Sequence, residues 1–144
     1  MKNNGWANDF KTLSFKGKLL VVVGLLVMSG GMFLKYHSDY VKNLHGNTNV
    51  SAQVVSNAIA SNKTVVFYNQ DCSACQRAFP KLMFRNWLHK DILFVNLHSK
   101  KNNHFVNDYK IQGTPTYVNN AGSFYNVKPD QLDDLLTHQP VNSN

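Results

Sequence analysis

Cys72 and Cys75 are the residues of this chain best suited to chemistry. They are the only cysteines among 144 residues, and two residues separate them. An apolar run (64–68) comes shortly before them, and a stretch with helical character follows. The first turn of a helix presents unpaired N–H groups and the positive end of the helix dipole, which stabilise a thiolate. Because the thiolate attacks in thiol–disulfide exchange, the spacing predicts two thiols that form a reversible disulfide.

Two other interpretations of the pair stay open. The first is half of a zinc site, for which histidines would have to supply the remaining ligands because the chain has no further cysteine. The nearest candidates are His89, His98 and His104, and none of them forms the H-x(3–5)-H pair of a zinc finger. The second is a pair of buried structural cysteines. We expect no metal and no cofactor other than the disulfide itself.

The charge of the chain does not indicate a nucleic-acid partner. The net charge is +7, but lysines of residues 1–18, next to an apolar run, contribute part of it. The chain has only two arginines, Arg77 and Arg85, and no stripe of arginines with interleaved aromatic residues. The length fits a single domain, which we place at residues 50–144. The basic balance therefore predicts membrane flanks and a mildly basic domain, with no nucleic acid bound.

Residues 19–34 form an apolar run that predicts one transmembrane helix. The sixteen residues carry no charge, and Lys16 and Lys18 precede them while Lys35 follows. A helix extended to residues 15–36 would measure roughly 33 Å, enough for the ~30 Å hydrocarbon core of a bilayer. Two alternatives are a cleaved signal peptide, with small residues at 29–31 but no A-x-A pattern, and a buried core helix.

The lysines predict how the chain is oriented. Four lysines precede the run and two follow it within the linker that we expect at residues 35–49. The positive-inside rule places residues 1–18 in the cytoplasm and the domain outside it, in a single-pass protein of a bacterial plasma membrane. Disulfides form and persist outside the cytosol. The membrane segment and the cysteine pair therefore predict the same compartment.

The pattern of the domain predicts alternating helices and strands that end in a hairpin. Along the chain we expect helix 50–62, strand 64–69, helix 72–89, strand 91–97, helix 102–110, strand 116–118, strand 123–127 and helix 129–138. Such an order predicts an α/β fold with a central mixed sheet flanked by helices. The buried face of the second helix is expected to include Ala78, Leu82, Phe84, Trp87 and Leu88.

This order resembles the thioredoxin fold over residues 50–138. Three features carry the resemblance. The segment 67–75 resembles the strand that leads into the family's active site, Pro80 falls where many members have a helix-kinking proline, and residues 113–116 (Gly-Thr-Pro-Thr) resemble the family's cis-proline loop. The resemblance implies a thioredoxin-like fold, and the apolar run at residues 19–34 predicts that a transmembrane helix precedes it.

The resemblance also implies roles for four residues. Cys72 would be the exposed nucleophile and Cys75 the buried resolving thiol. Pro115 would be cis and face the pair, and the backbone of Thr114 would bind an extended substrate segment. The implied partners are proteins with thiols or disulfides, together with a redox partner in the membrane.

Some positions depart from the family pattern. Asp71 replaces a common tryptophan, and its carboxylate would either disfavour the Cys72 thiolate or cap the helix. Val66 stands where many members have a buried acid, so proton transfer at Cys75 needs water or another group; His98 is a nearby candidate. The intervening Ser-Ala dipeptide lacks the histidine of strongly oxidising members, and the direction of exchange stays open.

Three functions agree with the sequence. The first is a membrane-tethered thiol–disulfide oxidoreductase acting on exported proteins through Cys72 and Cys75. The second is a non-catalytic thioredoxin-like subunit of a bacterial secretion, bacteriocin-export or conjugation apparatus. The third is a thiol protein that delivers metal or haem.

Overall fold

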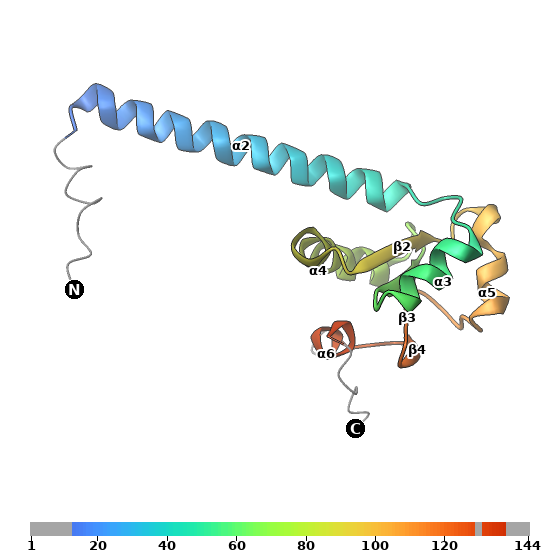
Figure 1. Ribbon diagram of the computed structural model, residues 1–144. Coiled ribbons are helices and arrows are strands. Elements are labelled where there is room, and N and C mark those ends of the chain that lie inside the picture. The colour runs from blue at the N-terminus through green and yellow to red at the C-terminus, as the bar shows by residue number, and fades with distance from the viewer. Residues whose placement is uncertain (1–12, 129–130, 138–144) are drawn as a thin grey trace, which may run out of the picture. The chain divides into compact units, whose positions relative to one another are not determined.

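The computed structural model describes residues 13–128 and 131–137 of the chain. The chain divides into two compact units, Met1–Asp39 and Tyr40–Asn144. The first unit contains most of the long helix α2 (Phe15–His45), and the second contains the end of that helix and all the strands. Figure 1 traces these elements along the chain.

Helix α2 is long and apolar enough to cross a membrane. It has 31 residues, and the mean hydropathy of its most apolar stretch is 2.0. At 1.5 Å per residue it measures about 46 Å, more than the hydrocarbon core requires. None of its residues is buried in the protein, so the buried-core alternative is wrong. The helix also continues to His45, through residues that we expected to form a linker, and the second unit begins at Tyr40.

Four strands form one mixed sheet. These are β1 (Thr64–Tyr68), β2 (Ile92–Asn96), β3 (Thr116–Asn119) and β4 (Gly122–Tyr125), in the spatial order β2-β1-β3-β4. Strand β1 pairs with β2 in parallel and with β3 antiparallel, and β3 pairs with β4 antiparallel. The expected mixed sheet and its terminal hairpin are therefore confirmed. Strand β1 consists of β-branched and aromatic residues and is buried along its whole length, which suits its central position in the sheet.

Helices cover both faces of the sheet. Because side chains alternate along a strand, Val66 and Tyr68 of β1 face one side and Val65 and Phe67 face the other. The first side packs against α4 (Ser73–His89) and α6 (Leu132–Leu136), and the second against α3 (Ala52–Ala60) and α5 (His104–Asp108). The expected helices are thus present, within a few residues of their predicted bounds, where the structure describes them.

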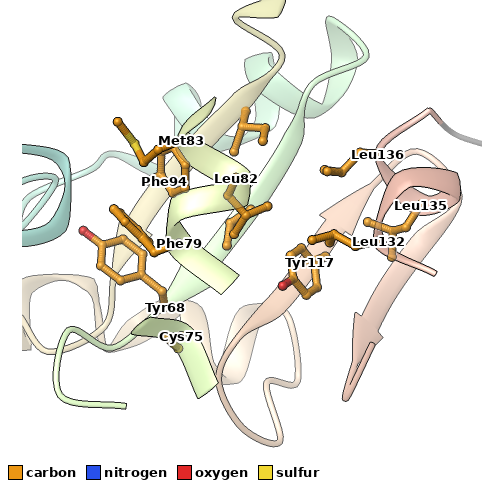
Figure 2. Packing of buried hydrophobic residues seen from close by; sticks show 12 residues of the cluster. Tyr68, Cys75, Phe79, Leu82, Met83, Phe94, Tyr117, Leu132, Leu135 and Leu136 are labelled. Carbon is orange, nitrogen blue, oxygen red and sulfur yellow. The ribbon is translucent and has the colours of Figure 1, made fainter. Parts of the chain in front are cut away.

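Aromatic rings fill the side of the sheet that α4 covers. The Phe79 ring centroid lies 5.1 Å from that of Tyr68 and 4.9 Å from that of Phe94. Figure 2 shows this cluster, with Cys75 at one edge of it and the leucines of α6 at the other. Arg85 then joins three elements at the far end of α4, because its guanidinium binds the Asp91 carboxylate at 2.7 Å and the Leu136 carbonyl oxygen at 3.0 Å.

The buried face of α4 differs in part from the prediction. Leu82 is buried and Ala78 is partly buried, but three expected core residues are exposed: Phe84, Trp87 and Leu88. The residues that face the core are instead Cys75, Phe79, Leu82 and Met83. The helix carries apolar residues on both faces, so periodicity alone could not choose the inward one.

The region between β2 and β3 also differs from the prediction. The expected helix 102–110 is divided into a 3-10 turn (Lys100–Asn102) and the short α5. Asn102 is fully buried where they meet. Its amide nitrogen donates to the carbonyl oxygens of Asn47 and Asn96, and its amide oxygen accepts from the Val50 N–H. One side chain therefore satisfies the backbone of the segment that leads from α2 into α3.

The last turn of α2 is part of the folded domain. The Tyr40 ring packs edge-on against Phe79, with centroids 5.5 Å apart. The buried Tyr68 hydroxyl donates to the Asn43 carbonyl oxygen at 2.5 Å and lies 3.1 Å from that of Leu44. The last carbonyls of a helix have no partner within the helix. Tyr68 therefore supplies a donor that the end of α2 needs.

We predict that Tyr68→Phe destabilises the domain by about 1–2 kcal/mol, because the ring stays packed while the carbonyls at the end of α2 lose their donor. The measurement is the free energy of unfolding of the detergent-solubilised chain in urea. Tyr125→Phe, at a half-exposed tyrosine on β4, is the matched control and should change stability by less than about 0.5 kcal/mol. Equal effects of the two substitutions would contradict the role given to Tyr68.

Candidate active site

Cys72 is the N-cap residue of helix α4. Its backbone is extended (φ −83°, ψ 119°), and its carbonyl oxygen accepts the first helical hydrogen bond, from the Gln76 N–H. The turn out of β1 is fixed by Asn69, whose side-chain oxygen accepts from the Asp71 N–H and whose carbonyl accepts from the Cys72 N–H. An asparagine that binds the backbone two residues on is typical of such turns. The turn therefore places Cys72 at the start of the helix, where its side chain is half-exposed to solvent.

Cys75 lies one turn further along α4 and faces the core. It is 1% exposed and belongs to the same cluster as Tyr68 and Tyr117 (Figure 2). Residues at i and i+3 of a helix lie on neighbouring parts of its surface, so one sulfur is accessible while the other is covered. Both cysteines are free thiols. The structure therefore places the two predicted site residues together but in unlike surroundings.

The surroundings of Cys72 favour its thiolate. Burial opposes ionisation, but hydrogen bonds from the Thr114 side chain, from Cys75 and from the Ala74 backbone outweigh it and lower the pKa of the Cys72 thiol below its ordinary value. These donors include backbone N–H groups of the first turn of α4, which have no partner within the helix. The start of α4 therefore supplies the stabilisation that the sequence predicts.

The surroundings of Cys75 favour its protonated form. Burial, together with a hydrogen bond to Cys72 and charge on Cys72, raises the pKa of the Cys75 thiol to about 11. Hydrogen bonds from the Asn69 backbone and the Thr114 side chain compensate only in part. Burial also raises the pKa of the Tyr68 and Tyr117 hydroxyls, so neither tyrosine can accept a proton from Cys75 near neutral pH.

The loop before β3 lies against Cys72. The Thr114–Pro115 peptide bond is cis, and the Cys72 thiol donates to the Thr114 carbonyl oxygen at 3.3 Å. The Thr116 hydroxyl donates to the Gly113 carbonyl oxygen at 2.6 Å, which holds the loop in place. A Cβ at Gly113 would stand only 2.6 Å from the Tyr125 ring, so this position has room for glycine alone unless Tyr125 moves.

Three residues singled out in the sequence lie around this centre. The Asp71 carboxylate is 3.0 Å from Nδ1 of His98, and both side chains are exposed. Asp71 therefore faces His98 instead of capping α4, whose cap residue is Cys72. Val66 is fully buried in the core, on the side of β1 that faces α4. Pro80 lies inside α4, further along the helix than the cysteines.

Three features identify the architecture of the domain. They are the order of the elements along the chain, the sheet order β2-β1-β3-β4 and the position of the cysteine pair at the start of α4. The domain has a thioredoxin-like fold. In this thioredoxin-like domain the loop at Thr114 and Pro115 borders the exposed cysteine, as the sequence resemblance implies.

Two solved structures are similar to this chain. Thioredoxin O1 from Arabidopsis thaliana, in its oxidised state, has 15% sequence identity and a TM-score of 0.49 over 62% of this chain and 92% of that one. Mitochondrial thioredoxin 3 from Saccharomyces cerevisiae, in its oxidised form, has 17% identity and a TM-score of 0.44 over 58% of this chain and 89% of that one. No family model matches the chain, and no curated protein matches it in sequence.

Sequence reasoning missed three contributors to the site: Asn69, Tyr117 and Tyr125. Asparagine after a strand is a recognisable turn signal, so the role of Asn69 could have been found. Tyr117 and Tyr125 reach the site from distant strands, and no local pattern indicates that. In the ranges 13–128 and 131–137, no three His, Cys, Asp or Glu side chains gather in a way that could hold a metal ion.

We predict that Cys72 alkylates at least about tenfold faster than Cys75 at pH 7, because only the thiolate reacts and the pKa of Cys72 is lowered while that of Cys75 is raised. Raising the pH should increase the Cys75 rate about tenfold per unit up to its pKa near 11, whereas the Cys72 rate should level off at a lower pH. The measurement is peptide mass spectrometry after timed exposure of the reduced chain to iodoacetamide.

The urea-unfolded chain is the control for this reactivity difference. Unfolding removes both the helix start and the buried environment, so the two rates should then agree within a few-fold. Equal rates in the folded chain would show that the sequence of the motif, and not the fold, sets thiol reactivity.

Proposed function

We propose that this protein is a membrane-anchored thiol–disulfide oxidoreductase that exchanges disulfides with exported proteins. The observation that carries the proposal is the contrast between its two sulfurs. Cys72 is accessible and has a lowered pKa, while Cys75 beside it is buried and has a pKa of about 11. A lone structural pair of cysteines needs no such contrast, whereas an attacking thiol followed by a resolving thiol depends on it.

In the first step the Cys72 thiolate attacks one sulfur of a client disulfide. A bond forms between Cys72 Sγ and that sulfur, the client disulfide breaks, and the second client sulfur leaves as a thiolate. The Thr114 carbonyl oxygen lies 3.3 Å from the attacking sulfur. An extended client segment can pair with this exposed backbone, which would hold its disulfide in reach.

In the second step Cys75 resolves the mixed disulfide. Cys75 loses its proton and attacks Cys72 Sγ, which forms the Cys72–Cys75 disulfide and releases the client sulfur as a thiolate. The client gains two electrons and the protein loses two. Formation of the mixed disulfide removes the charge of Cys72, which is one cause of the high pKa of Cys75, so ionisation of Cys75 becomes easier when it is needed. The reverse sequence oxidises a client dithiol.

The N-terminal helix supports the proposed location. Helix α2 is long enough and apolar enough to cross a membrane. Four lysines precede its apolar run, which by the positive-inside rule favours a cytoplasmic N-terminus and an extracytoplasmic domain. The redox pair would then face a compartment in which disulfides persist. The clients are proposed to be exported proteins for this reason.

A second candidate is a non-catalytic accessory subunit of an envelope apparatus. Val66 favours it, because an apolar residue stands where a proton-transfer acid would assist Cys75. Cys75 would then be slow to resolve mixed disulfides. The two candidates differ in whether the function needs the sulfurs.

We predict that the chain accelerates the reduction of an insulin disulfide by dithiothreitol, and that Cys72→Ser lowers the rate to the uncatalysed level. Cys75→Ser should retain attack by Cys72 but accumulate a mixed disulfide with the client, because the resolving thiol is missing. Turbidity reports the reaction, and non-reducing gels report the trapped species.

The exposed Ser123→Ala change on β4 is the control and should leave the rate within twofold of the wild type. Equal rates for the wild type and Cys72→Ser would rule out the catalytic function. Full biological function in a Cys72→Ser, Cys75→Ser double variant would establish the accessory role instead.

A further inference from the structure

Helix α4 carries an apolar patch that the protein core does not use. The patch consists of Phe84, Trp87 and Leu88, whose exposed fractions are 54%, 45% and 54%. The Phe84 and Trp87 ring centroids are 6.2 Å apart. Positions i, i+3 and i+4 of a helix share one face, so these three side chains form a continuous exposed surface, which Trp87 joins to the buried Met83 one turn before it.

The charged side chains near this patch are mainly basic. Helix α4 contains no acidic residue along its length, and Arg77, Lys81 and the adjoining Lys90 are exposed. Lys81 also binds the Asp133 carboxylate at 2.9 Å. Asp91, the acid that follows, is bound by the Arg85 guanidinium at 2.7 Å. Tryptophan and phenylalanine flanked by lysine and arginine are the side chains that lie at the boundary between lipid acyl chains and anionic headgroups. The charge complementarity therefore favours an anionic lipid surface as the occupant.

The chain itself keeps α4 close to such a surface. Tyr40 contacts Phe79 of α4, and Tyr40 follows the apolar run that ends at Leu34 by six residues of continuous helix. At 1.5 Å per residue this connection measures about 9 Å. If residues 19–34 span the bilayer, the length of this connection brings the headgroup region within reach of the second unit.

We propose that Phe84, Trp87 and Leu88 insert into the headgroup region of the anionic membrane that anchors the chain. This inference depends on the proposed membrane anchor but not on the redox activity. Cys72 precedes the patch by 12 to 16 residues, which corresponds to roughly 18–24 Å along α4. The inserted end of the helix therefore leaves the sulfur pair clear of the lipid and open to clients.

The test uses the fluorescence of Trp87 in the full chain. The chain has two tryptophans, and a Trp6→Phe change makes Trp87 the only one. This variant is reconstituted at low protein density into vesicles of phosphatidylcholine and phosphatidylglycerol whose acyl chains are either unmodified or brominated. We expect brominated lipid to lower the Trp87 emission at least twofold, and less so in vesicles of phosphatidylcholine alone.

A reporter on the other side of the domain is the matched control. Val106 is 37% exposed and lies on α5, which covers the opposite face of the sheet. In a Trp6→Phe, Trp87→Phe, Val106→Trp variant, brominated lipid should change the emission by less than about a fifth. Cys72 alkylation at the wild-type rate verifies that each variant is folded.

Three results would overturn the inference. The first is quenching of Trp87 no stronger than that of the Val106→Trp reporter. The second combines two observations: brominated lipid does not quench Trp87, and Trp87 is shielded from the aqueous quencher acrylamide only at high protein density, losing this shielding at tenfold lower density. That result would assign the patch to a contact with a second copy of the chain. The third is a chain that does not float with the vesicles, which would remove the anchor as well; insulin reduction by the same sample tests the redox proposal separately.

Discussion

The difference in environment between two sulfurs in one helical turn is the constraint on which the site depends. Cys72 is placed at the open start of α4, where backbone N–H groups and Thr114 stabilise its thiolate, and Cys75 is held in an aromatic core that disfavours charge. The central strand β1 positions both sulfurs, because it ends at Tyr68 and the turn at Asn69 leads from it directly into the start of α4. The loop at Thr114 completes the site from a strand that pairs with β1 on its other side.

The end of α2 packs into this core. Tyr68 alternates with Val66 on β1, so its ring enters the cluster that also holds Cys75, while its hydroxyl binds the carbonyl of Asn43. The same strand therefore contacts both the end of α2 and the helix that carries the cysteine pair. Asn102 binds backbone groups on both sides of the connection from α2 to α3, at Asn47 and Val50.

Most of the fold could be predicted from the sequence because its signals are local. The alternation of apolar strands and helices, the cysteine spacing and the Gly-Thr-Pro-Thr loop each lie within a few residues of one another. The errors arise where tertiary contacts decide. Residues 35–45 look like a polar linker but stay helical and pack through Tyr40, and α4 has two apolar faces, of which the sheet covers only the one with Phe79. The partners of Asp71 could not be predicted, because His98 reaches it from the end of another strand.

The most direct test is an equilibrium titration of the full chain against glutathione redox buffers, read by mass spectrometry of the alkylated thiols. If Cys72 and Cys75 act as one couple, both thiols disappear together in a single two-electron transition, in which a tenfold change in the ratio corresponds to about 30 mV. A midpoint near ~−270 mV would make the pair a reductant and one near ~−120 mV an oxidant. If Cys72 instead becomes glutathionylated while Cys75 stays reduced at every potential, the pair does not exchange electrons as a unit and the account is wrong.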